Sequence, residues 1–91
     1  MQNRYFVIDP DQIVVDDLAH AIRVHDPVAE VLVFRAPEAA LEVLSQQRPR
    51  AVLLNHDPRG FSRTRIGLAL QDLGVPYAFS GLVNEAEAEG A

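Results

Sequence analysis

The sequence predicts one small α/β domain built on a parallel β-sheet, and three observations support this fold class. Four short apolar segments with the composition of strands alternate with helical segments of about ten to fifteen residues. The strand-like segments are continuously apolar, which is typical of strands that are buried on both faces. The chain of 91 residues is long enough for a single domain. We therefore expect the order βαβαβαβ, with right-handed crossovers between parallel strands.

The first third of the chain predicts a strand and a helix. The strand, residues 5–8, ends at Asp9 and Pro10, because proline cannot donate to a sheet ladder. The helix follows, with Asp11 as its expected N-cap and Pro27 just after its end. Its apolar face is indicated by residues that recur at helical spacing, namely Val14, Leu18, Ala21, Ile22 and His25.

The middle of the chain predicts a second strand, a second helix and a third strand. Residues 31–34 are rich in β-branched and aromatic side chains, which favour a strand. Pro37 stands at a helix-opening position, and Pro49 is expected to end that helix. The third strand, residues 51–54, stops at the amide side chain of Asn55. Functional side chains of parallel α/β sheets gather at such strand ends.

The last third predicts one more helix, one more strand and a tail. Ser62 is a candidate N-cap for the third helix, and Gly74 is a candidate C-cap. A fourth strand follows within residues 75–81, so the domain is expected to span residues 1–81. Residues 82–91 form an acidic, alanine-rich tail whose composition is compatible with both helix and disorder.

The composition restricts the partners and the location that we expect for the protein. The formal net charge is −5, and the basic residues are eight arginines without any lysine, which argues against a clustered basic surface for nucleic acid. The absence of cysteine excludes disulfides and thiolate metal sites. No apolar run approaches the roughly 18 residues of a membrane span, and no signal-peptide pattern opens the sequence. We expect a cytoplasmic protein with neither a membrane nor a nucleic-acid partner.

Three segments of the sequence resemble the receiver domain of two-component response regulators. They are "YFVIDPD", "APEAALEVLSQQRPRAVLLN" and "ALQDLGVPYAFSG", and they cover most of residues 4–81. The resemblance implies a flavodoxin-like three-layer sandwich with strand order 2-1-3-4-5. It also implies that the last units of the family pattern, a fourth helix, a fifth strand and a fifth helix, are missing here.

The residues that receivers use for phosphoryl transfer are changed in this sequence. The resemblance places the phosphoacceptor aspartate at Asn55, whose amide oxygen is a poor nucleophile. The acidic metal-binding pair falls on Asp9 and Pro10, and Asp11 comes next in the chain. The lysine of the family has no counterpart, and its switch hydroxyl is matched only approximately by Ser80. The resemblance therefore implies a degenerate receiver that is not an enzyme and holds no metal or cofactor.

Two other residues leave alternatives open. Asp57 is a possible displaced phosphoacceptor, as is Asp9, but the Pro and Gly content of residues 55–60 favours a simple turn. Phe61 is an aromatic side chain in a polar loop, so it either folds onto the core or contacts a partner. A small-ligand sensor at the carboxyl edge of the strands is a further alternative, although no phosphate-binding loop is present.

An incomplete receiver fold is expected to expose apolar surface. Without a fifth strand, the fourth strand is an open edge, and the sheet face beside the first helix is uncovered. Tyr77 and Phe79 are candidate contact residues on that strand, together with Phe61. We expect a homodimer, or coverage of the face by Leu82 and Val83 from the tail. The sequence thus favours a non-enzymatic pseudo-receiver, a phosphorylation-independent protein-interaction module of two-component-type signalling.

Overall fold

The fold is a four-stranded parallel sheet with helices on both faces. The computed structural model describes residues 3–80. The strand order is β2-β1-β3-β4, and neighbouring strands pair in parallel. This confirms the predicted α/β class, the alternation of strands and helices, and the parallel sheet. The elements are β1 (Arg4–Ile8), α1 (Gln12–His25), β2 (Glu30–Phe34), α2 (Pro37–Leu44), β3 (Ala51–Leu54), the 3₁₀ helix η1 (Phe61–Arg63), α3 (Arg65–Leu73) and β4 (Tyr77–Phe79).

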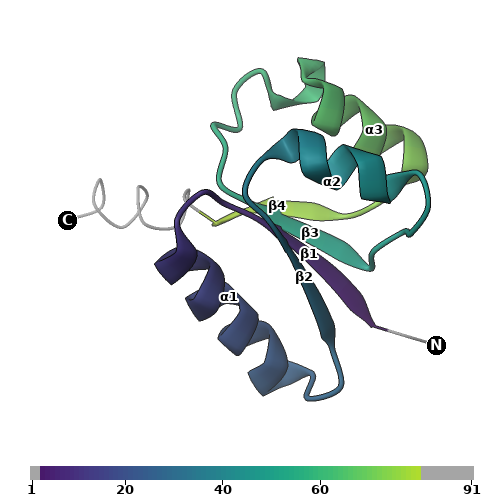
Figure 1. Ribbon diagram of the computed structural model, residues 1–91. Helices are drawn as coiled ribbons and strands as arrows, with labels where there is room; N and C mark the ends of the chain where they lie inside the picture. The colour runs from purple at the N-terminus through teal and green to yellow at the C-terminus, as the bar shows by residue number, and fades with distance from the viewer. Residues whose placement is uncertain (1–2, 81–91) are drawn as a thin grey trace.

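The α-helices lie on opposite faces of the sheet, as Figure 1 shows. α1 covers one face and packs mainly against β1 and β2, the two strands that it connects. α2 and α3 lie on the other face and pack against each other. This arrangement follows from right-handed crossovers, because the chain moves outward from β1 to β2 and then back across the sheet to β3 and β4. Within residues 3–80, no helix is long and apolar enough to cross a membrane.

The main hydrophobic core lies between the sheet and the layer formed by α2 and α3. Phe61 in η1 is 2% exposed, and its ring centroid lies 5.0 Å from that of Tyr77 and 4.9 Å from that of Phe79. Because aromatic pairs bury large areas, these contacts attach the short strand β4 to the core. The buried members of the core are Phe6, Ile8, Ala40, Leu44, Val52, Leu54, Phe61, Ile66, Leu70 and Val75.

The predicted helix caps are confirmed at two positions and wrong at one. Asp11 caps α1, since its Oδ1 accepts a hydrogen bond from the backbone N–H of Ile13 at 2.9 Å. Gly74 ends α3 in the left-handed conformation, with a φ of 68°. The N-cap of α3 is Thr64 rather than Ser62, because η1 takes up Ser62 and brings Thr64 to the start of the helix.

The second helix is shorter than the sequence predicts. α2 ends at Leu44, so the prediction that it continues to Pro49 is wrong. The Ser45 hydroxyl donates to the backbone carbonyl of Glu42 at 2.9 Å, which is the local competition with helix bonding that serine favours. The chain then turns, with the N–H of Gln47 donating to the carbonyl of Val43.

The side of α1 that faces the sheet differs from the face that its apolar spacing indicates. Val15 and Ala19 are the buried residues of α1. The residues of the predicted apolar face are only half-buried or are exposed, and they follow one flank of the helix: Val14, Leu18, Ala21, Ile22 and His25. α1 therefore has more apolar surface than its own sheet covers.

Candidate functional site

The carboxyl edge of the sheet places Asp9 and Asn55 at the ends of neighbouring strands. Asp9 follows β1, and its backbone N–H donates to the carbonyl oxygen of Phe34 at 3.0 Å. Asn55 follows β3, and its backbone N–H donates to the carbonyl oxygen of Ile8 at 3.1 Å. Both residues thus extend strand ladders whose spacing is about 4.8 Å. This edge is where a parallel α/β sheet carries its functional groups.

The side chain of Asp9 is buried and half satisfied. The residue is 1% exposed, and its Oδ1 accepts a hydrogen bond from the backbone N–H of Asp11 at 2.8 Å. This bond turns the chain from β1 into α1. The other oxygen, Oδ2, is buried without a hydrogen-bond partner among residues 3–80. Burying a carboxylate oxygen in this way opposes folding, because the lost hydration is not replaced.

Asn55 and Pro10 add no negative charge beside this buried carboxylate. Both residues are exposed. The amide of Asn55 is neutral, and the ring of Pro10 offers no oxygen or nitrogen ligand. Hard cations such as Mg²⁺ bind through oxygen ligands, usually including carboxylates. In the described part of the chain, no group of three or more His, Asp or Glu side chains is placed to hold a metal ion.

Asp57 belongs to the turn that follows β3. Its Oδ1 accepts hydrogen bonds from the backbone N–H of Arg59 at 2.9 Å and from Arg59 Nε at 3.1 Å, and its Oδ2 accepts one from Nη2 at 2.9 Å. The Arg59 side chain, followed by its backbone N–H, lowers the pKa of Asp57 below its ordinary value. Gly60 completes the turn with a φ of 76°. Asp57 thus has the turn-forming geometry that the sequence favoured.

Ser80 lies at the same edge but on the other side of β3. It follows β4, so β3 separates it from the strand that ends at Asp9. The Ser80 Oγ is buried and has no hydrogen-bond partner within residues 3–80. Ser80 lines a cavity beside α1. Within residues 3–80, the sheet therefore places two buried polar atoms without hydrogen-bond partners, Asp9 Oδ2 and Ser80 Oγ, at the ends of different strands.

The three aromatic residues predicted to contact a partner form one cluster on the covered face of the sheet. Phe61 is buried, so it takes the core alternative, and its predicted role as a surface contact is wrong. Tyr77 and Phe79 are half-buried and pack against the same core, with ring centroids 5.8 Å apart. The exposed residue of β4 on the α1 side is Ala78. A contact through the uncovered face would therefore involve Ala78 and the part of Phe79 that lines the same cavity, and not Tyr77.

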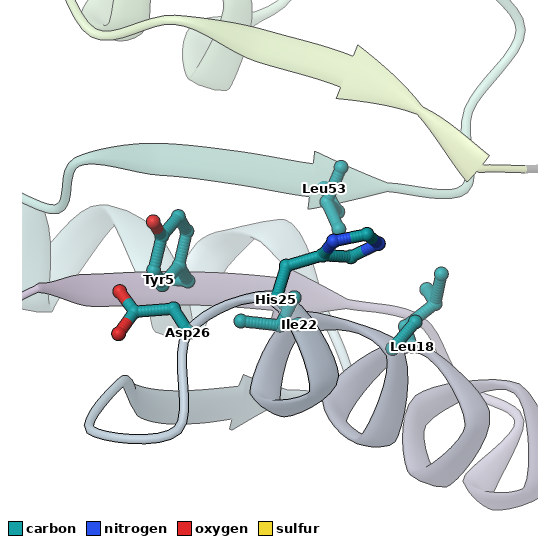
Figure 2. Close-up of a pocket in the computed structure, with 7 residues that line it drawn as sticks. Tyr5, Leu18, Ile22, His25, Asp26 and Leu53 are labelled. Atoms are coloured by element: carbon teal, nitrogen blue, oxygen red, sulfur yellow. The ribbon is translucent and has the colours of Figure 1, made fainter.

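An apolar groove lies on the α1 side of the sheet, where the sequence predicts an uncovered face beside the first helix. It lies between α1 and the β3–β4 half of the sheet and consists of two cavities of about 270 Å³ and about 440 Å³. Leu18 and Leu53 line both cavities. Figure 2 shows Leu18 and Ile22 of α1 with Leu53 of β3 and Tyr5 of β1 around the first cavity. The signal for this groove, called the α1 groove below, was the apolar spacing of α1.

The tail predicted for residues 82–91 lies outside the described residues, and so do Leu82 and Val83. Comparison with known proteins gives no match: no family model, no curated protein and no solved structure is similar to the chain.

The burial of Asp9 predicts that Asp9→Asn stabilises the fold. The amide keeps an oxygen that can accept the hydrogen bond from the Asp11 N–H, and its neutral NH₂ group takes the place of the unpartnered carboxylate oxygen. Because burying a neutral polar group costs less than burying a charge, we expect the free energy of unfolding at pH 7 to rise by about 1 kcal/mol. Urea denaturation measures it, with Asp72→Asn on the exposed side of α3 as the control. A loss of stability would show that Asp9 has a favourable partner.

The lowered pKa of Asp57 predicts a pH-dependent contribution to stability. A carboxyl whose pKa is lower in the folded state stabilises the fold above its unfolded pKa, which is ordinarily 3.8. This contribution is lost as the pH falls through the lowered folded value. We expect Asp57→Asn to be slightly less stable than the wild type at pH 7 and equally stable near pH 2. Urea denaturation at both pH values checks this, and an unchanged difference would contradict it.

Proposed function

We propose that the chain is a pseudo-receiver: a phosphorylation-independent interaction module of two-component-type signalling that associates with itself. The observation that carries the proposal is Asn55 at the end of β3. There the resemblance to receivers places the aspartate that accepts the phosphoryl group. An amide is a weak nucleophile and does not yield an acyl phosphate. The sheet order 2-1-3-4 is compatible with the flavodoxin-like architecture of receivers.

The neighbouring carboxylates are poor substitutes for an aspartate at position 55. Asp9 is almost completely buried, so a phosphodonor has little access to its oxygens. Asp57 is exposed, but both of its oxygens accept hydrogen bonds from Arg59, and its lowered pKa makes it a weaker nucleophile. Pro10 replaces the carboxylate that would help a metal to offset phosphoryl charge. These features favour loss of the phosphoryl switch.

The surfaces of the fold favour a binding role in place of the switch. Among the described residues, β4 pairs with β3 alone, so its other edge offers unpaired backbone groups. The α1 groove adds a contiguous apolar surface next to this edge. Apolar surfaces of this kind mark interaction sites in many proteins. We expect a module with such surfaces and without a phosphoacceptor aspartate to bind its partner constitutively.

The proposal predicts that the protein does not accept a phosphoryl group. The full chain is incubated with acetyl phosphate and MgCl₂, and its intact mass is measured. We expect no adduct, because no accessible carboxylate stands at the end of β3. A mass gain of one phosphoryl group would contradict the proposal. Asp57→Asn and Asp9→Asn would then identify the acceptor, since the true acceptor is the one whose removal abolishes the adduct.

A double variant that restores the missing carboxylates provides a matched comparison for Mg²⁺ binding at this edge. Asn55→Asp with Pro10→Asp restores both carboxylates beside Asp9 and creates a set of oxygen ligands for Mg²⁺. Because a ligand that binds the folded state raises the melting temperature, MgCl₂ is expected to raise the Tm of the double variant and leave that of the wild type unchanged. An equal rise in the wild type would show that the native pocket binds the ion.

A further inference from the structure

One half of the α1 side of the sheet has no helix over it among the described elements. α1 packs mainly against β1 and β2. On the same side, β3 presents the half-buried Leu53 and β4 presents the exposed Ala78. Parallel sheets are normally covered on both faces, because their strands are apolar on both sides. The α1 groove, which follows this half of the sheet, therefore calls for an occupant with an apolar surface.

The described part of the chain ends at the wall of this groove. Its last three residues, Ala78, Phe79 and Ser80, all line the larger cavity of about 440 Å³. Eleven residues, 81–91, follow Ser80 in the sequence. Leu82 is two residues beyond Ser80, so even an extended backbone keeps their Cα atoms within about 7 Å of each other. The first apolar residue of the tail is thus held close to the groove by the chain itself.

The sequence of the tail has the spacing of a helix with one apolar side. At about 100° per residue, four of its apolar or small residues fall within an arc of about 100°, namely Leu82, Val83, Ala86 and Gly90. The three glutamates at positions 85, 87 and 89 fall outside this arc. An apolar stripe of this width is typical of a helix that packs on an apolar surface.

We propose that residues 82–91 bind as a short helix in the α1 groove of their own chain. In this arrangement, Leu82 and Val83 cover Leu53 and Ala78, and the glutamates face the solvent. The proposal goes beyond the interaction module proposed above, and it leaves the open edge of β4 for self-association. A partner that uses the groove has to displace the tail, so the tail lowers the affinity of this surface for a partner.

The length of the tail matches the length of the groove. Along α1, the groove runs from Val14 in the larger cavity to His25 in the smaller one, which is about 16 Å at the rise of an α-helix. Residues 82–91 span about 15 Å as a helix. A helix this short is marginal in water, so its formation depends on the contact with the groove. The short connection to β4 favours this contact, because it gives the tail a millimolar effective concentration at the groove.

Ser80 supplies a polar anchor for the start of this helix. Its Oγ is buried and has no hydrogen-bond partner within residues 3–80. Serine is a preferred N-cap, whose hydroxyl oxygen accepts a hydrogen bond from the backbone N–H two or three positions later, here that of Leu82 or Val83. Asp17 lines the same cavity as Ser80, and a carboxylate near a helix N-terminus is favourable. The tail thus supplies a donor that Ser80 Oγ lacks within the described residues.

Disulfide trapping in the full chain tests the contact, because the chain contains no native cysteine. Ala86 is about 9 Å along a helix from Ser80, and Ala21 is about 6 Å along α1 from Asp17, so Ala86 and Ala21 are expected at a similar level of the groove. We expect the variant with Ala86→Cys and Ala21→Cys to form a disulfide within one chain under mild oxidation. The intact mass then falls by two hydrogen atoms, and the protein stays monomeric on a non-reducing gel.

Two controls separate a docked tail from one that only collides with the groove. Ala86→Cys with Leu68→Cys should stay reduced, since Leu68 is 54% exposed on α3, on the other face of the sheet. Adding Leu82→Asp and Val83→Asp to the first pair keeps the connection to β4 but puts charges against apolar surface, so disulfide formation should slow about tenfold or more. An unchanged rate would overturn the proposal, and so would a disulfide that forms between two chains instead of within one.

Thermal unfolding provides a second readout without any cysteine. Leu82→Ser with Val83→Ser should lower the Tm by about 5 °C or more, because it removes the apolar contacts of the tail with the groove. Glu85→Ser with Glu87→Ser changes the polar side of the same segment and should leave the Tm nearly unchanged. Equal effects of the two double variants would contradict the contact. The phosphoryl-transfer experiment is independent of both readouts, so failure of the tail contact leaves the pseudo-receiver proposal standing.

Discussion

The structure depends on the burial of β1 between two parallel neighbours. Phe6 and Ile8 in β1 pair in register with Leu32 and Phe34 on one side, and with Val52 and Leu54 on the other. Because β1 is central and covered on both faces, its residues from Phe6 to Ile8 are almost completely buried. The next residue, Asp9, is drawn into the same environment. The position of Asp9 at the end of this buried strand thus leaves its side-chain carboxylate little contact with water.

The buried Asp9 has a structural role where β1 passes into α1. Asp9 directs the chain into α1 through its bond to the Asp11 N–H, and Asp11 in turn caps the helix. Asn55 continues the β1–β3 ladder through its backbone N–H, which any residue except proline at that position could do. The neutral amide of Asn55 therefore differs from an aspartate at this position mainly by the absence of a negative charge. A neutral side chain there avoids repulsion with a carboxylate that is already buried without a full set of partners.

Local chemistry made most of the fold predictable, and tertiary packing accounts for the rest. Asp11 and Gly74 act through bonds within a few residues, so their caps could be recognised in the sequence. Thr64 was missed because η1 depends on Phe61 folding onto the core, a long-range contact that leaves no local pattern. The positions of Asp9 and Asn55 followed from strand ends, whereas the burial of Asp9 requires the whole sheet. The apolar spacing of α1 was visible, but the burial of Val15 and Ala19 against the sheet depends on tertiary packing.

We propose that the carboxyl edge of the sheet at Asp9, Pro10 and Asn55 binds neither a divalent cation nor a phosphoryl group. This proposal is tested most directly by amide NMR of the ¹⁵N-labelled protein, titrated first with MgCl₂ and then with beryllofluoride, which mimics a phosphoryl group. We expect the amide signals of Asp9, Asn55 and Ser80 to stay at their positions in both titrations. Saturable shifts confined to these signals, with further shifts on adding beryllofluoride, would contradict it.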